Sequence, residues 1–274
     1  MSKTATIAMS VLAGALAVGA AAWWLRSGGA PAPASVAQEA AGTSTPPSAP
    51  TAAVPVASAP PRIAHPVPTM ASASSPPART FELELVGLLG GAPVAALFRS
   101  DDFDRRFVAT IDNLGRSAAP PSVWPVNPVG GRLRVAASPD GDVIGPDNGA
   151  RYEPYVRLLE QVDLSAVVRL YVQHYPELQR EYEALGFPGR YFNDRVVAVL
   201  DQLLATPTAA GALHVHLPRV EGPQPTRPWL LYDFDDPALR SLAAGQRLLL
   251  RMGPDNERRV KERLRELRRL LVTA

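Results

Sequence analysis

The stretch from Leu170 to Pro207, LYVQHYPELQREYEALGFPGRYFNDRVVAVLDQLLATP, decides the fold class of this chain. Its apolar residues recur at spacings of three and four, which is the period of an amphipathic helix. Pro176 interrupts this pattern and Gly186 closes it, because proline breaks a helix and glycine ends one. The stretch therefore predicts a helix that is kinked or broken at Pro176, followed by a second helix that Pro207 ends.

The sequence on either side predicts more helices. Ser100, Asp163 and Asp236 are suited to cap three of them, because their side-chain oxygens can accept bonds from the first free amides. The last helix carries seven basic and three acidic residues around a narrow apolar seam, a pattern typical of a solvated helix face. The expected helices cover residues 83–89, 103–114, 152–161, 164–185, 193–204, 237–252 and 257–271, with a further short helix near Pro93. Residues 81–85 also alternate, so this part could equally begin as a strand.

The signals for β-structure are few. Residues 213–217 and 229–234 alternate like two strands, and a stretch rich in proline and glycine separates them. Residues 116–151 predict a long loop or hairpin, with 132–136 as its one strand. We therefore expect residues 80–274 to form a single mostly α domain with a small β-hairpin element, an α+β fold.

The N-terminal segment, residues 1–26, predicts a transmembrane anchor. Residues 7–25 carry no charge and would span about 28 Å as a helix, close to the thickness of the hydrocarbon core. Trp23 and Trp24 suit the interface, and Arg26 follows them. The alternative is a cleaved signal peptide, for which the alanines at 20–22 could supply the cleavage site.

Residues 27–79 predict a disordered linker. They hold 12 of the 29 prolines, together with alanine, serine and threonine, and too little apolar surface to offset chain entropy. Fully extended as polyproline II, this linker would reach about 160 Å. With the N-terminus inside, we expect a single-pass protein of the inner membrane whose C-terminal domain lies in the periplasm.

Charge and composition exclude several functions. Residues 1–79 hold four basic residues and one acidic residue, which leaves 24 basic and 25 acidic residues in 80–274. That balance offers no broad basic face, so we expect no nucleic-acid partner. The chain has no cysteine, which excludes disulfides, thiolate zinc sites and a cysteine nucleophile.

The densest polar and aromatic cluster is Tyr191, Phe192, Asn193, Asp194 and Arg195. Two aromatic rings, an amide, a carboxylate and a guanidinium could line a binding cleft. A structural interpretation competes with this one: Asn193 or Asp194 would cap the next helix, Phe192 would pack against it, and Arg195 would pair with a carboxylate. The structural interpretation is the preferred one.

Other candidates for chemistry are weak. His214 and His216 would point from one face of a strand, as a metal pair requires, but no third ligand is evident nearby. The sequence contains no recognisable nucleophile and base pair, phosphate loop or dinucleotide fingerprint. We therefore assign no catalytic residue, no metal and no cofactor.

Four stretches carry a resemblance to a known family. They are residues 105–114 (RRFVATIDNL), 150–163 (ARYEPYVRLLEQVD), 170–207 and 236–268 (DPALRSLAAGQRLLLRMGPDNERRVKERLRELR). The chain resembles the bacterial membrane-anchored family called Domain of Unknown Function 3014, and residues 220–231 depart from its pattern. The resemblance implies an N-terminal anchor and a Pro/Ala-rich spacer, and it implies no activity.

Together these observations predict a membrane-anchored envelope protein with a non-catalytic binding or scaffolding domain. Its partners would be the membrane, through residues 7–25, and a protein or an envelope polymer. The alternative function is a hydrolase of envelope or cell-wall polymer, in which a carboxylate such as Asp194 acts as acid or base. The sequence leaves open whether the protein is an enzyme.

Overall fold

The computed structural model describes residues 62–67, 79–91, 95, 97–99, 101–219, 222 and 228–272. The expected anchor and most of the expected linker lie outside these residues. Among the described residues, none of the helices has the length and apolar character that crossing a bilayer requires.

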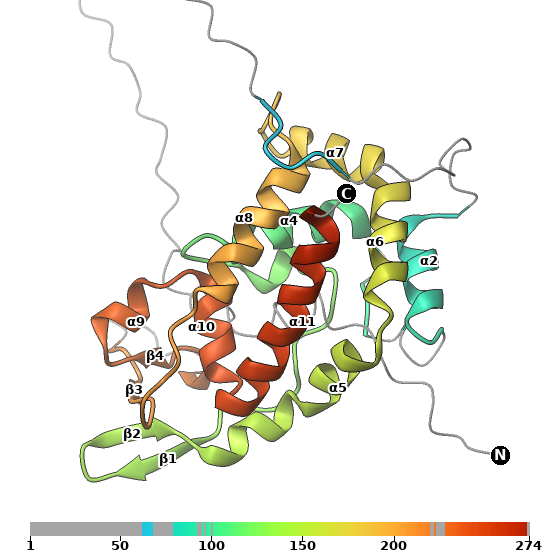
Figure 1. Cartoon of the computed structure of the whole chain (residues 1–274). Coiled ribbons are helices and arrows are strands. Elements are labelled where there is room, and N and C mark those ends of the chain that lie inside the picture. Colours follow the sequence, from blue (N-terminus) through green and yellow to red (C-terminus); the bar gives the residue numbers. More distant parts are fainter. Residues whose placement is uncertain are drawn as a thin grey trace, which may run out of the picture.

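Helices dominate the described part of the chain, as predicted (Figure 1). Two short antiparallel sheets complete the α+β fold. The α-helices are α2 (Phe81–Leu88), α4 (Phe103–Leu114), α5 (Glu153–Gln161), α6 (Leu164–Gln173), α7 (Tyr175–Ala184), α8 (Phe192–Leu204), α9 (Pro237–Ser241), α10 (Ala244–Arg251) and α11 (Pro254–Val272). The 3-10 helices are η3 (Pro121–Val123), η4 (Pro146–Arg151) and η5 (Pro228–Leu230), and the strands are β1 (Val135–Ser138), β2 (Gly141–Ile144), β3 (Val215–His216) and β4 (Asp233–Phe234).

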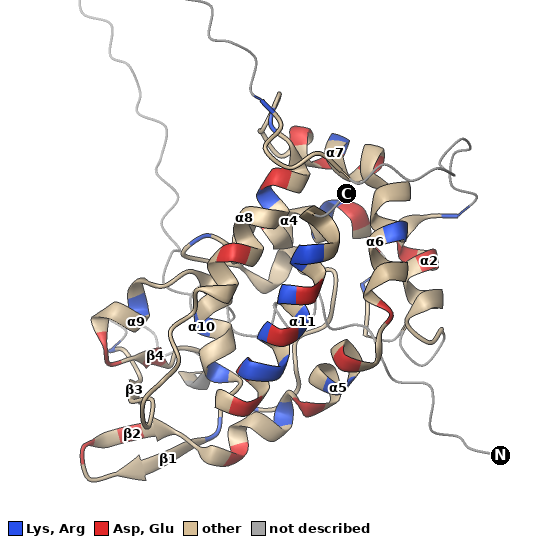
Figure 2. Cartoon of the chain, viewed as in Figure 1, with Lys and Arg blue, Asp and Glu red and all other residues tan. Residues whose placement is uncertain are grey.

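The longest helix, α11, lies among α5, α6, α8 and α10 (Figure 1). Its expected apolar seam is confirmed, because Val260, Leu264, Leu267 and Leu271 are all buried. Its charged residues alternate in sign along the helix (Figure 2), and Arg258 pairs with Asp255 and Glu262 on the same helix. The exposed face of α11 is therefore the solvated, ion-paired surface that the sequence predicts.

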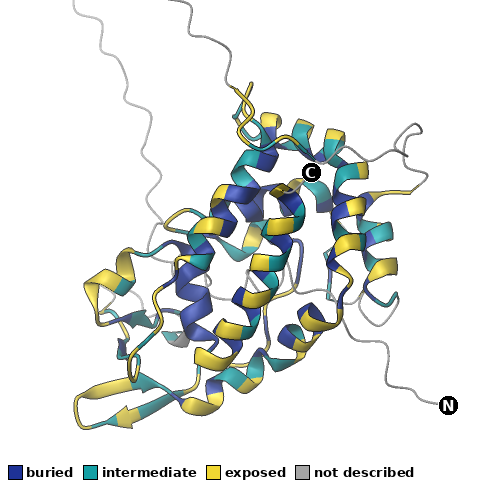
Figure 3. Ribbon diagram, in the orientation of Figure 1, coloured by how far each residue is buried: buried dark blue, intermediate teal, exposed yellow. Residues whose placement is uncertain are grey.

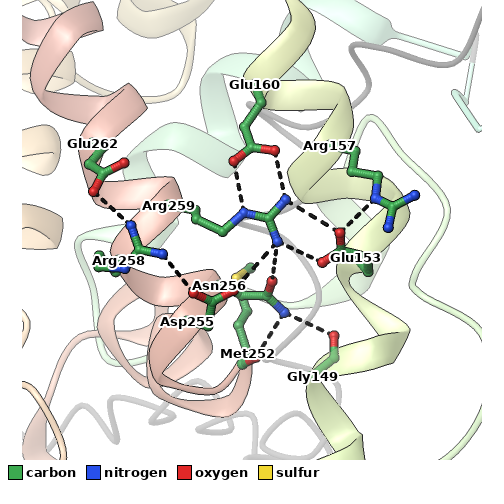
Figure 4. A network of polar contacts seen from close by, with 10 residues as sticks. All are labelled: Gly149, Glu153, Arg157, Glu160, Met252, Asp255, Asn256, Arg258, Arg259 and Glu262. Atoms are coloured by element: carbon green, nitrogen blue, oxygen red, sulfur yellow. Dashed lines mark hydrogen bonds and ion pairs between the residues drawn. The ribbon is translucent and has the colours of Figure 1, made fainter.

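Arg259 fastens α11 to α5 (Figure 4). Its guanidinium donates to Glu160 at 2.6 Å and to Glu153 at 2.7 Å, and Arg157 also pairs with Glu153. These hydrogen bonds, chiefly those from Arg259, lower the pKa of both glutamates below its usual value. Both carboxylates are partly exposed, so this network fixes the register of the two helices more than it stabilises the fold.

The hairpin of β1 and β2 extends from one end of the domain (Figure 1). Residues 139–140 form its turn, and Gly141 follows with a φ of 115°, a conformation that favours glycine. The predicted strand at 132–136 is wrong in its bounds, since β1 begins at Val135. The predicted pair at 213–217 and 229–234 is confirmed as antiparallel but shortened to β3 and β4, because residues 228–230 turn into η5.

Three predictions about helix ends are confirmed. Asp163 caps α6 and Asp236 caps α9, each through bonds from amides of the first turn. The chain also breaks before Pro176, where α6 gives way to α7 at His174.

One other prediction about helix ends is wrong, and one lies outside the described residues. The N-cap of α4 is Asp102, in the left-handed conformation and without a side-chain bond, while the expected cap Ser100 is not among the described residues. The single helix expected over 237–252 is two helices, because the extended backbone at Leu242 and Ala243 separates α9 from α10.

Helix α10 is buried on every side (Figure 3). It packs against α4, α8 and α11, and Gly245 lies close to both α4 and α8. A Cβ at this position would lie 2.5 Å from Leu203 Cδ2 and 3.1 Å from the Leu114 carbonyl oxygen. The absence of a side chain at Gly245 is therefore what allows three helices to meet.

We expect Gly245→Ala to destabilise the protein by about 1–3 kcal/mol, the usual cost of overpacking a core. Gly87→Ala is the matched control, since Gly87 is also helical but has open space around it. That change should raise stability by about 0.5–1 kcal/mol through helix propensity alone. Urea unfolding followed by circular dichroism measures both, and equal effects would contradict the close packing at Gly245.

Candidate functional site

The site begins with an unusual start to α8. The N-cap residue is Tyr191, and its side chain makes no capping bond. The first amides are satisfied from α7 instead: the Phe192 amide donates to Gln179 Oε1 at 2.8 Å, and the Asn193 amide donates to Tyr175 Oη at 3.4 Å. The prediction that Asn193 or Asp194 caps this helix is therefore wrong.

Two members of the predicted cluster have structural roles. Phe192 is completely buried, and its ring lies 5.4 Å from the ring of Tyr182 and 6.4 Å from that of Phe107. Arg195 pairs with a buried carboxylate, as predicted: its Nε lies 2.8 Å from Asp112 Oδ1. Tyr191 is half-buried at the helix start. These contacts join α8 to α4 and α7.

Asn193 and Asp194 face a different part of the chain. They contact residues 62–67, the short segment drawn in light blue beside α7 in Figure 1. Asp194 accepts hydrogen bonds from the amides of Ala64 (3.1 Å) and His65 (2.6 Å), one on each carboxylate oxygen. Asn193 Nδ2 donates to the carbonyl oxygen of His65 at 2.9 Å. All three bonds go to main-chain atoms.

Contacts within the domain orient the side chain of Asn193. It is fully buried, and its Oδ1 accepts a hydrogen bond from the Tyr171 hydroxyl at 3.1 Å. The hydroxyl of Tyr175 donates to Gln179 Oε1, and the amide of Gln179 bonds in turn to the Arg190 carbonyl. We call these residues the α8 clasp: Tyr171, Tyr175, Gln179, Asn193 and Asp194.

The electrostatics of the clasp keep its hydroxyls as donors. Burial raises the pKa of Tyr171 well above its usual value, and Tyr175 and Asp194 raise it further. Burial also raises the pKa of Tyr175. Since a protonated Tyr171 must donate to Asn193 Oδ1, the amide is fixed with its Nδ2 directed at the segment.

The segment is bent where the clasp holds it. The backbone bends at Ala64 and His65, which brings two successive amides onto one carboxylate, an arrangement known to bind anions. His65 and Val67 are half-buried, while Ala64 and Pro66 are exposed. Residues 62–67, which lie within the expected disordered linker, therefore contact the domain.

The predicted cluster included Asn193 and Asp194, but the sequence did not indicate that they contact residues 62–67. Composition marked all of 27–79 as a spacer, and hydrogen bonds to a backbone leave no signature in side chains. One signal was present. Ile63 and His65 are the sole isoleucine and histidine of residues 27–79, and they lie inside the docked segment.

The histidine pair is not part of this site. His214 and His216 lie at β3, where His216 Nδ1 contacts Asp235 Oδ1. Within the described ranges, no group of three or more potential ligands is arranged to hold a metal ion. The clasp itself offers one carboxylate with both oxygens already engaged, which suits binding more than proton transfer.

The fold and the clasp define a mostly helical domain that holds a peptide segment at the start of one helix. Residues 103–268 match the family described as protein of unknown function DUF3014. The match covers more than half of the chain, so this protein belongs to that family, as the resemblance predicted. No curated protein and no solved structure matches the chain.

Removing one hydroxyl tests the clasp. Tyr171→Phe leaves the buried Asn193 Oδ1 without its donor, so we expect a loss of about 1–3 kcal/mol in the free energy of unfolding. Tyr155→Phe on α5 is the matched control, since Tyr155 is half-buried and remote from the clasp. We expect it to change stability by less than about 0.5 kcal/mol. Chemical denaturation measures both, and equal losses would argue against a special role for the Tyr171 hydroxyl.

Proposed function

We propose that this protein is a non-catalytic binding protein whose domain captures the main chain of a polypeptide in the α8 clasp. The observation that carries the proposal is the set of three hydrogen bonds from Asn193 and Asp194 to Ala64 and His65. The carboxylate accepts hydrogen bonds from two backbone amides, and the side-chain amide donates one to a backbone carbonyl. Together they recognise a main chain, not a particular side chain.

The strength expected of such a site is moderate. Hydrogen bonds to an ionised carboxylate are stronger than neutral ones, and each contributes about 1.5–3 kcal/mol. Burial of Asn193 and its bond to Tyr171 reduce the entropy lost on binding, since the amide is already oriented. A protein partner fits these donors and acceptors better than a sugar polymer does, because it supplies successive amides.

The second part of the proposal places this domain at a membrane. Residues 7–25 are uncharged and long enough to cross a bilayer, and the family resemblance implies such an anchor. A single-pass anchor with the N-terminus inside would hold the domain in the periplasm, tethered by the Pro/Ala-rich linker. The partner would then be another component of the cell envelope.

Peptide binding tests the first part. We would replace residues 62–67 by Gly-Ser-Gly-Ser-Gly-Ser in the full chain and titrate it into a fluorescent peptide of residues 60–69, PPRIAHPVPT. The peptide should bind, and Asp194→Asn should weaken binding at least about tenfold, because an amide nitrogen would replace one acceptor. Asp201→Asn, on the same helix, is the control and should have no effect. Absence of binding, or equal binding by both variants, would refute the proposal.

Membrane attachment has its own test. A phosphatase reporter fused after Ala274 should be active only outside the cytoplasm, and the protein should remain with membranes after a high-salt wash. Deletion of residues 1–26 should release the protein into the soluble fraction. Recovery of the intact chain as a soluble form that begins near Trp23 would show a cleaved signal peptide instead.

A further inference from the structure

We propose that residues 62–67 are an internal stand-in for the partner: they occupy the α8 clasp until a segment of the same main-chain chemistry displaces them. This inference rests on the proposed function and adds two points to it. It names the kind of segment that the partner presents, and it makes the protein's own spacer the competitor that regulates access.

The contacts define the ligand position by position. Ala64, the first residue that bonds to the clasp, is exposed and contributes only its backbone amide. The second, His65, contributes both an amide and a carbonyl and is half-buried. The backbone must bend between them so that two amides reach one carboxylate. The ligand is therefore a bent segment with two free successive amides.

Proline suits the third position for two reasons. Pro66 has no amide hydrogen, and the three hydrogen bonds between segment and clasp involve only Ala64 and His65. A proline also narrows the backbone conformations open to the residue before it, which lowers the entropy lost when that carbonyl is fixed. Val67 is half-buried at the fourth position, where a small apolar side chain fits. The partner should carry this pattern.

The docked segment is suited to being displaced. Of its six residues, Arg62, Ile63, Ala64 and Pro66 are exposed, and Ile63 leaves 48% of its surface in contact with solvent. The segment thus buries little apolar area, and its main anchorage is the three bonds to the clasp. Its advantage over a free partner is that it belongs to the same chain, because a tethered ligand has an effective concentration of about millimolar order.

Tethering therefore sets the affinity and concentration that a partner needs in order to displace the segment. A free peptide binds only the fraction of molecules whose clasp is empty, so the apparent affinity falls by that fraction. Partners that are weak or dilute are excluded, while partners concentrated in the same compartment replace the segment. Displacement also releases residues 62–67 from the domain, which lengthens the tether between the domain and residue 61.

The experiment compares three full-length chains in detergent: the wild type, the chain with residues 62–67 replaced by Gly-Ser-Gly-Ser-Gly-Ser, and a control with residues 48–53 replaced in the same way. Each is titrated into the fluorescent 60–69 peptide, with anisotropy as the readout. We expect the 62–67 replacement to bind at least about tenfold more tightly than the wild type and the control. A peptide methylated on the nitrogen of the His65 position should lose at least about tenfold in affinity.

Each outcome has one meaning. Equal binding by all three chains, still sensitive to Asp194→Asn, would leave the peptide-binding function intact and overturn the internal competitor. No binding by any chain would remove the proposed function and this inference together. Equal affinity for the methylated peptide would overturn the ligand pattern. If sedimentation shows that the wild type self-associates while the 62–67 replacement is monomeric, the occupant comes from a second copy, and the intramolecular assignment is wrong.

Discussion

The site depends on how the first amides of α8 are satisfied. A helix that begins in the interior must find acceptors for these amides, and polar residues of its own first turn usually supply them. Here the acceptors are Gln179 and Tyr175 of α7. Because α7 supplies these acceptors, the side chains of Asn193 and Asp194 can bond elsewhere, although both residues lie in the first turn of α8.

The same stretch of chain ties the site to the core. Phe192 points into the aromatic interior, Asn193 and Asp194 point to residues 62–67, and Arg195 points to Asp112 on α4. Adjacent residues of a helix project about 100° apart, so one turn can contact three surroundings at once. The clasp is consequently held firmly, since its two binding residues stand between Phe192, which is packed in the core, and Arg195, which pairs with the buried carboxylate of Asp112.

A firmly positioned clasp and a loosely held segment suit the exchange of ligands that we propose. The interior of the domain is fixed by buried contacts such as those of α10 and α11, whereas the 62–67 segment is held by three hydrogen bonds and remains mostly exposed. The two parts differ in how readily they open, because local opening follows the amount of buried apolar contact. The exchange that we propose would therefore leave the fold intact.

The sequence alone determined most helices of the domain, the break before Pro176, the caps at Asp163 and Asp236, the apolar seam of α11, the pairing of Arg195 with a carboxylate, and the family. All of these depend on local periodicity, on residues with strong conformational preferences, or on strings long enough to compare. The sequence also drew attention to residues 191–195 but assigned Asn193 and Asp194 to capping. Only the tertiary structure decided that α7 caps α8 and that the clasp holds residues 62–67. The physical reason is that these bonds join main-chain atoms to side chains elsewhere in the chain, 13 and 18 positions away at the start of α8 and about 130 positions away at residues 62–67. A backbone amide is the same in every residue, so no pattern of side chains records where it is bound.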